Sequence, residues 1–230
     1  MLSKNKNPLL LKDCGFVIDG TAQTQLKLTN PGIITTILIT GGEKCQVRLF
    51  LVGGGGRGSG HGGGGSGFIL YRTIHLMPLS TLTAYVGDKG EVSKVIADGS
   101  ATVRAEPGKE SFLSGDGWNT GGDGWSGGGD GCCNRYKGGS NGEDGLGDGH
   151  EGKGTGQKLT SFPMSNFFLS PGNGGIIEKT TSDEGGGGGG VLVDGLGPDR
   201  VLGQGEGYGG GGSSGDGLQG IILMEIIEQS

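Results

Sequence analysis

Glycine occupies 59 of the 230 positions of this chain and is concentrated in short blocks. Glycine loses more backbone entropy on folding than any other residue, so such a chain folds only if the missing side chains serve a purpose. The purpose we expect is close packing of extended backbone against extended backbone. We assign this structural role to four blocks: Gly53, Gly54, Gly55 and Gly56; Gly62, Gly63, Gly64 and Gly65; Gly185, Gly186, Gly187, Gly188, Gly189 and Gly190; and Gly209, Gly210, Gly211 and Gly212.

Apolar segments rich in β-branched and aromatic residues alternate with the glycine blocks. Clear examples are Cys45–Val52, Phe68–Leu76 and Gly220–Ile227. Turn signals such as Asn30–Gly32 separate them, and no segment has a helical period flanked by caps. The sequence therefore predicts an all-β chain with almost no α-helix. The strongly apolar last segment is expected to be central in a sheet.

The order of these segments predicts one glycine-rich domain over residues 14–230, preceded by an N-terminal arm at 1–13. Strands from residues 14–113 and 176–227 would form a jelly-roll-like β-sandwich, which supplies the ordinary hydrophobic core. Glycine-rich excursions would leave this sandwich and return to it at residues 53–67, 115–156 and 185–217.

The excursions are either flexible linkers or an ordered bundle. Gly/Ser linkers are disordered, but these blocks are short, contain little serine and lie between apolar strands. Trp118 and Trp125 also lie in the second excursion, and linkers rarely carry tryptophan. Extended helices with three residues per turn have no internal hydrogen bonds, so their backbone groups can bond to neighbouring chains. We predict such a polyglycine-II bundle. Collagen is excluded because the chain has only seven prolines and no strict Gly-X-Y repeat.

Charge and hydropathy exclude two classes of partner. The net charge is -6 without a basic stripe, so nucleic-acid binding is not expected. No apolar run approaches the roughly 18 residues that span a bilayer, and the opening Met1–Lys12 has too few leucines for a signal-peptide core. Either the numbering starts at a processed terminus or the protein is cytosolic. We expect an extracellular protein, because glycine-rich low-complexity chains typically serve outside cells.

Four cysteines, Cys14, Cys45, Cys132 and Cys133, are an even number. Free thiols are one alternative, but an extracellular setting favours disulfides. Cys14 and Cys45 lie at the edges of early predicted strands and could meet across a sheet. The adjacent Cys132 and Cys133 could form a vicinal disulfide, bridge two segments or link two chains.

Residues with catalytic or cofactor-binding patterns are not found. The glycine runs lack the Lys-Ser/Thr ending of a phosphate-binding loop and no helix follows them. His61, His75 and His150 have no spacing typical of a metal site or a catalytic triad. We therefore expect no enzyme, no catalytic residue, no cofactor and no metal.

Aspartate recurs every seven residues in Gly-Asp-Gly triplets, at Asp116, Asp123 and Asp130. Asp144 and Asp148 follow. Aligned carboxylates could bind calcium through their oxygens. We prefer the simpler interpretation, in which they are solvated turn residues that keep a glycine bundle soluble.

Several segments resemble a known family. Val47–Gly56 (VRLFLVGGGG), Gly62–Tyr71 (GGGGSGFILY) and Thr81–Gly87 (TLTAYVG) resemble the glycine-rich domain of phage tail-fibre and bacterial surface proteins, in which strands enter and leave glycine runs. Gly209–Ile227 is similar to that family's usual ending. Gly185–Gly212 is similar to uncharacterised animal glycine-rich proteins. The extracellular glycine-rich domain of anaplastic lymphoma kinase and leukocyte tyrosine kinase follows the same plan.

The resemblance implies a tumour-necrosis-factor-like β-sandwich that carries polyglycine-II helices in a hexagonal array. It implies no catalytic residues, and the kinases' signalling role is not carried over.

Two functions follow from this plan. The first is a structural, self-assembling protein of an extracellular matrix, fibre or adhesive, whose partner is another copy of itself. The second is a recognition module that binds a glycan or a cell-surface protein. Its contacts would come from loops that present Trp118, Trp125, Tyr136 and the aromatic residues of Phe162–Phe168.

Overall fold

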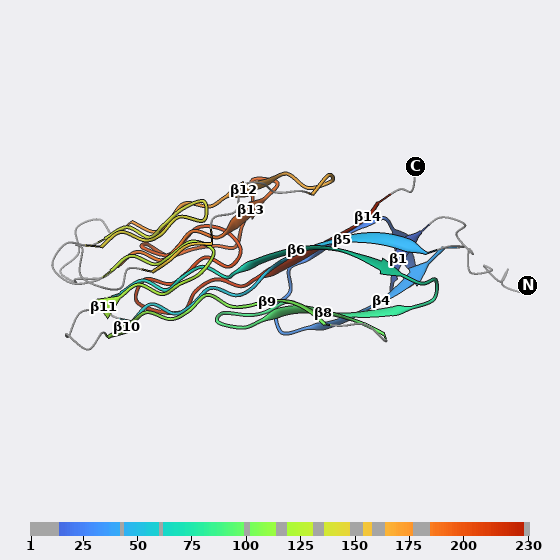
Figure 1. Cartoon of the computed structure of the whole chain (residues 1–230), viewed down its shortest axis with the longest axis horizontal. Coiled ribbons are helices and arrows are strands. Elements are labelled where there is room, and N and C mark those ends of the chain that lie inside the picture. Colours follow the sequence, from blue (N-terminus) through green and yellow to red (C-terminus); the bar gives the residue numbers. More distant parts are fainter. Residues whose placement is uncertain are drawn as a thin grey trace, which may run out of the picture.

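The protein is an elongated all-β molecule, seen in a computed structural model (Figure 1). The described residues are 14–41, 44–59, 62–98, 102–113, 119–130, 136–147, 154–157, 164–176 and 185–227. Every regular element among them is a β-strand, so the predicted all-β class is confirmed. No helix in this part of the chain is long and apolar enough to cross a membrane.

Two antiparallel sheets form one end of the molecule. The larger has six strands in the order β2 (Thr21–Gln23), β1 (Gly15–Ile18), β4 (Ile34–Thr40), β7 (Thr81–Tyr85), β8 (Ser93–Ala97) and β9 (Val103–Ala105). The smaller has four strands in the order β3 (Gln25–Leu28), β14 (Ile221–Ile227), β5 (Cys45–Val52) and β6 (Ile69–Leu76).

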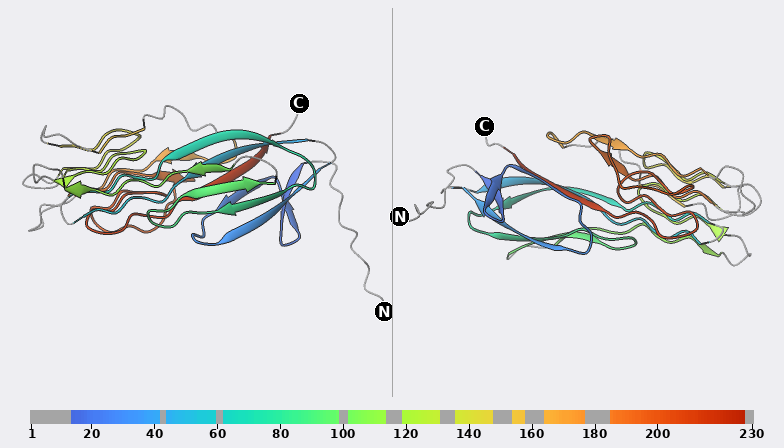
Figure 2. Two further views of the ribbon diagram at one scale, coloured as in Figure 1. Left: turned by 60° about the horizontal axis from the view of Figure 1, so that its bottom comes forward. Right: turned by 180° about the vertical axis from the view of Figure 1, so that it is seen from behind.

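The other end consists mainly of extended glycine-rich segments that run alongside one another (Figures 1 and 2). Two small strand pairs belong to it: β10 (Phe112–Leu113) with β11 (Asn119–Thr120), and β12 (Leu169–Pro171) with β13 (Val191–Val193). We call strands β1–β9 and β14 the two-sheet half. We call the described parts of residues 53–68, 106–157 and 164–220 the glycine half.

The last apolar segment lies in the middle of its sheet, as predicted. β14 pairs with β5 on one side and β3 on the other, so that Ile222 lies opposite both Leu51 and Leu28. The sequence analysis gave no strand at β8. Its exposed positions include Ile96 and its buried positions include Ser93, so the alternation of polar and apolar residues is not visible in the sequence.

Two hydrophobic clusters share β5. The first fills the space between the sheets and includes Phe16 and Ile37 from one sheet and Leu49 from the other. The second lies on the outer face of the four-stranded sheet, where Phe50 and Val52 of β5 pack with side chains of the glycine half. Burial on both faces explains why the second half of β5, Leu49–Val52, is continuously apolar, whereas Gln46 and Arg48 interrupt the first half.

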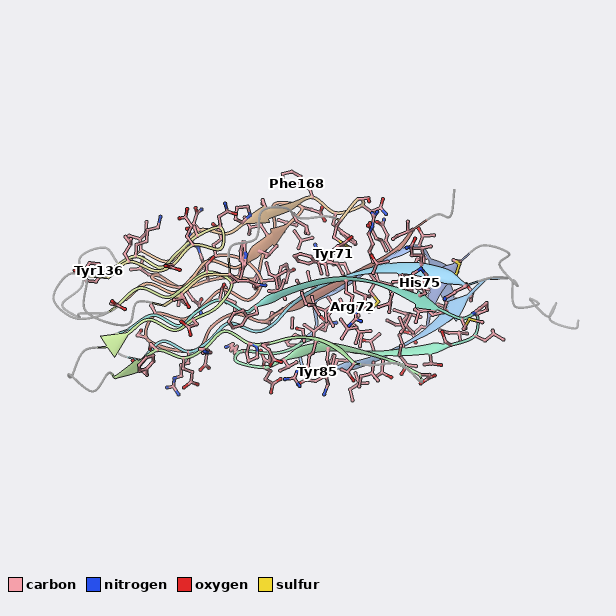
Figure 3. All side chains as sticks on the ribbon, viewed as in Figure 1. Tyr71, Arg72, His75, Tyr85, Tyr136 and Phe168 are labelled. Carbon is pink, nitrogen blue, oxygen red and sulfur yellow. A yellow bond between two sulfur atoms is a disulfide. The ribbon has the colours of Figure 1, made fainter. Side chains whose placement is uncertain are left out.

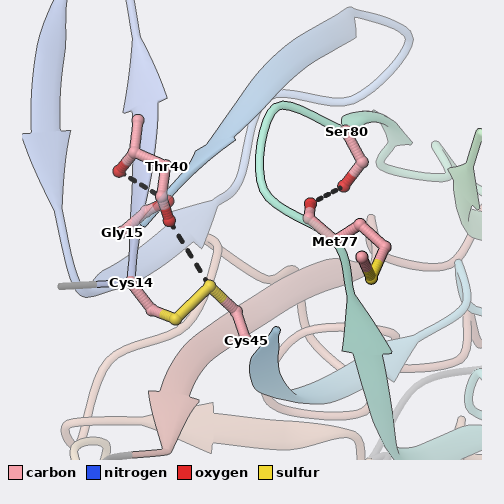
Figure 4. The surroundings of a disulfide bond; sticks show 6 residues. All are labelled: Cys14, Gly15, Thr40, Cys45, Met77 and Ser80. Carbon is pink, nitrogen blue, oxygen red and sulfur yellow. Dashed lines mark hydrogen bonds between the residues drawn. A yellow bond between two sulfur atoms is a disulfide. The ribbon is translucent and has the colours of Figure 1, made fainter. Parts of the chain in front are cut away.

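A disulfide joins Cys14 and Cys45, with their Cα atoms 5.6 Å apart (Figure 4). Cys14 immediately precedes β1 of the six-stranded sheet, and Cys45 begins β5 of the four-stranded sheet. The bridge therefore ties the two sheets together at one end. Cys132 and Cys133 lie outside the described residues.

Removal of this disulfide should destabilise the fold strongly. The bridge closes a sequence separation of 31 residues, for which loss of chain entropy in the unfolded state gives about 3–4 kcal/mol. We expect a Cys14→Ala/Cys45→Ala variant to lose stability of that order in denaturant unfolding. A reductant should lower the melting temperature of the wild type more than that of the variant. An equal response of both proteins would contradict this role.

Candidate functional site

The backbone of the glycine half continues the pairing of the strands that enter it. β5 and β6 are paired up to Val52 and Ile69, and beyond them the N–H groups of Gly53 and Gly56 donate to Phe68 O at 3.1 Å and Gly65 O at 2.9 Å. The pairing of β5 with β14 continues in the same register through Gly55 and Gly58, which donate to Leu218 O at 2.7 Å and Gly215 O at 2.8 Å. The glycine segments are thus extensions of three adjacent strands, β14, β5 and β6.

Beyond the strands, the hydrogen bonds repeat every three residues. The N–H groups of residues 63, 64 and 65 donate to the carbonyls of residues 129, 212 and 109, and those of residues 66, 67 and 68 donate to residues 126, 209 and 106. Three consecutive residues therefore point to three different neighbours. The fourth residue returns to the first neighbour, which runs in the opposite direction.

The carbonyl groups of the same segment accept from three further segments. Gly63 O accepts from Gly122, Gly64 O from Gly188 and Gly65 O from Gly56. This segment is consequently surrounded by neighbours, and its backbone groups are satisfied without any side chain.

Neighbouring segments lie too close for a Cβ atom. A Cβ built on Gly64 would lie 2.2 Å from Gly56 O, and one on Gly187 would lie 1.9 Å from Gly211 O. The contacts are to backbone, which has no rotamer by which to move away. All four predicted glycine blocks are buried. At most of their positions glycine is needed because a Cβ atom would clash with a neighbouring backbone, and not because φ is positive.

Alanine at position 187 should destabilise the protein by about 3 kcal/mol or more, since overpacked backbone must move apart. The matched control is Gly215→Ala, where a Cβ would meet nothing within 4 Å and φ is ordinary. That change should be neutral or stabilising by about 0.4–1 kcal/mol, because it restricts the unfolded chain. Thermal and denaturant unfolding measure both, and similar melting temperatures for the two variants would contradict close packing at Gly187.

Aspartates bind backbone groups of the glycine half, and Asp130 does so from a buried position, which differs from the solvated turn residue expected from the sequence. Asp130 Oδ1 accepts from the Gly121 N–H at 2.9 Å, and Asp144 Oδ1 accepts from the Gly156 N–H at 2.8 Å. No group of three or more His, Cys, Asp or Glu that could hold a metal ion occurs within the described ranges. Asp116 and Asp148 lie outside them. Asp130 and Asp144 therefore serve as acceptors for N–H groups of the glycine-rich segments.

Asp123 binds two neighbouring residues, Thr155 and Lys109. Its Oδ1 accepts from the backbone N–H and the hydroxyl of Thr155 at 3.0 and 2.7 Å, and its Oδ2 lies 3.0 Å from Lys109 Nζ. Partial burial opposes ionisation, but the bonds from Thr155 and the charge of Lys109 outweigh it and hold the pKa of Asp123 below its ordinary value.

An Asp123→Ala variant should be less stable than the wild type by about 1 kcal/mol at neutral pH, because Thr155 loses its acceptor while the Lys109 pair is screened by solvent. A depressed folded-state pKa stabilises fully above the unfolded-state pKa of about 3.9 and ceases to do so as pH falls through the folded-state value. The difference between the two proteins should therefore shrink below pH 4 in unfolding measurements. The control is Asp199→Ala, since Asp199 is exposed. A stability difference between Asp123→Ala and the wild type that does not change with pH would contradict a contribution from the Asp123 charge.

The aromatic residues proposed for recognition are not gathered in one place. Trp125 is fully buried in the second hydrophobic cluster, so its side chain packs inside the protein and does not face a ligand. Tyr136 is half-buried at the outer end of the glycine half, whereas Phe168 is 70% exposed beside β12 (Figure 3). Trp118 and Phe162 lie outside the described residues.

One groove on the glycine half combines positive charge with exposed aliphatic groups. Its volume is about 470 Å³. Lys137 and Arg200 line it together with Ile176, Val201 and Leu202, whose side chains are at least half exposed. Such a surface can bind an anionic group next to an apolar one.

Sequence reasoning missed two polar side chains that hold the halves together. Glu225 in β14 is only 1% exposed, pairs with Arg48 at 3.0 Å and accepts from the Asn166 N–H at 3.0 Å. Gln157 exchanges two hydrogen bonds with the backbone of Ile69, of 3.2 and 3.3 Å, as a neighbouring strand would. A lone glutamate within the apolar run Ile221–Ile227 was the available signal, since buried charges need partners.

Comparison with known proteins gives no relatives. No family model, curated protein or solved structure matches the chain.

Proposed function

We propose that this chain is a non-enzymatic structural protein of the extracellular space that assembles with copies of itself into a matrix, fibre or adhesive material. Its glycine half would be a polyglycine-II bundle inserted into a jelly-roll-like sandwich. The observation that carries the proposal is the three-residue repeat of backbone hydrogen bonds, in which one glycine segment bonds to several neighbours.

This bonding suits a mechanical role. A network of backbone hydrogen bonds, each worth about 1 kcal/mol net, stiffens the segments without large side chains. The segments run along the long axis and continue β5, β6 and β14 (Figure 2). A force applied to one half is therefore transmitted to the other through both the covalent chain and the hydrogen bonds between strands. A rod of this kind needs no catalytic pocket.

The location outside cells is supported by the Cys14–Cys45 disulfide. Disulfides form and persist in oxidising compartments and are rare in the cytosol.

Assembly is the property to test. We expect the purified full-length protein to grow in sedimentation-velocity measurements as its concentration rises, and electron microscopy to show regular particles or filaments. A species of monomer mass at every concentration would contradict the proposal. Sedimentation under reducing conditions separates assembly by surface contacts from assembly by Cys132 or Cys133 bridges between chains.

The second candidate function, recognition of a glycan or cell-surface protein, is favoured by the groove at Lys137 and Arg200. Its two cations fit an acidic glycan. Binding of sulfated or carboxylated sugars on a glycan array, lost in a Lys137→Ala/Arg200→Ala variant, would support it. A full-length monomer without such binding would argue against both functions.

A further inference from the structure

The turn between β6 and β7 carries an exposed leucine in a strained conformation. The Ser80 N–H donates to Met77 O at 3.2 Å, Pro78 is the second residue of the turn and Leu79, the third, has a φ of 62°. This is the pattern of a type II turn, whose third position favours glycine because φ is positive there. Leucine is strained at such a position.

Nothing inside the chain offsets this strain by burial. Leu79 is 71% exposed and Met77 is 63% exposed. The turn itself is held in place, since the Leu79 N–H donates to Ile39 O at 2.9 Å. Strain kept at an exposed position points to a role outside the monomer.

The outer face of the six-stranded sheet next to this turn carries no charge in its middle row. Leu38 of β4 lies opposite Thr81 of β7, only two residues from Leu79. The exposed Asp98 follows Thr81 across the sheet, and its Oδ2 accepts from the Thr81 N–H at 3.2 Å. In the next row, Thr83 lies between Thr36 and Ile96. Leu38 and Ile96 are 38% and 39% exposed. The third row, nearer the glycine half, contains Tyr85 and the charged residues Lys94 and Arg104.

The two sheets differ in what covers them. The outer face of the four-stranded sheet is covered by side chains of Trp125, Met164 and Leu169 from the chain itself. The outer face of the six-stranded sheet has no such cover among the described residues. Large exposed apolar groups on an open sheet face mark an interaction surface.

We propose that this face, together with the turn Met77–Ser80, binds a second copy of the same chain. We call this surface the outer patch; Leu38, Met77, Leu79, Thr83 and Ile96 belong to it. The inference rests on the proposed self-assembly and names its contact surface.

Size and charge favour a second copy. Six strands about 4.8 Å apart and about five residues long present roughly 500 Å² per copy. Two copies would thus bury about 1,000 Å² in total, the lower bound for a specific interface. The rows on either side of the uncharged middle row carry opposite charges, Asp98 in one and Lys94 and Arg104 in the other. A two-fold axis that runs across the strands brings the acidic row of one copy against the basic row of the other, so these charges lose water only to meet a partner.

Leu79→Asn in the full chain tests the patch. Asparagine tolerates positive φ better than leucine, so the melting temperature should stay the same or rise. Self-association measured by sedimentation equilibrium should weaken by about tenfold or more. A second variant, Thr83→Glu, places a charge in the centre of the patch and should also weaken association. Leu202→Asn is the matched control, because Leu202 is 66% exposed on the glycine half, and it should associate as the wild type does.

The outcomes separate the two proposals. If the wild type assembles and both patch variants assemble equally well, the outer patch is not the contact and self-assembly stands on another surface. If the wild type stays monomeric throughout, self-assembly fails and this inference fails with it. Weaker association of both patch variants with an unchanged control supports the outer patch.

Discussion

The structure depends on backbone hydrogen bonds between segments that lie too close together for a Cβ atom. In a sheet, each strand has two neighbours and its backbone groups point alternately to one and the other. At Val52 this arrangement changes: the residues before it pair only with β6 and β14, whereas Gly54 donates to Glu91 on a third side. The change from two neighbours to more is possible only because glycine leaves the space around the chain open to other backbones.

The two halves therefore share continuous backbone pairing, and the glycine half is not a separate unit attached to the two sheets. β5, β6 and β14 pass from one into the other without a change of register, and the second hydrophobic cluster lies over the junction. Phe50, Val52 and Trp125 belong to this cluster, so apolar packing joins the sheet to the glycine half. Glu225 and Gln157 add polar contacts at the same junction. An ordinary apolar cluster thus anchors glycine-rich segments that have few large side chains of their own.

The sequence predicted the all-β class, the central last strand and the burial of the four glycine blocks, because each leaves a local signal in composition or pattern. It could not predict which glycine segments lie side by side. A glycine such as Gly64 has no side chain to complement its neighbours, so nothing in the sequence distinguishes Gly212 from any other acceptor. The role of Trp125 was wrong for a related reason: a tryptophan between glycines looks like an exposed contact until the sheet that covers it is known. The strand β8 was missed because Ser93 and Ile96 invert the usual burial of polar and apolar residues.

This dependence restricts where a function that needs specific side chains can reside. Interior glycines cannot change without moving a neighbouring backbone, so the bundle interior carries no chemical variety. Side chains that distinguish one partner from another must lie on the outermost glycine-rich segments, as Lys137 and Arg200 do, or on the two-sheet half, as Leu79 does. The position on the two-sheet half lowers the stability of the fold and the position on the glycine half does not, since Leu79 occupies a conformation better suited to glycine. A residue that weakens its own fold in order to be exposed is best explained by a contact that the isolated chain does not make.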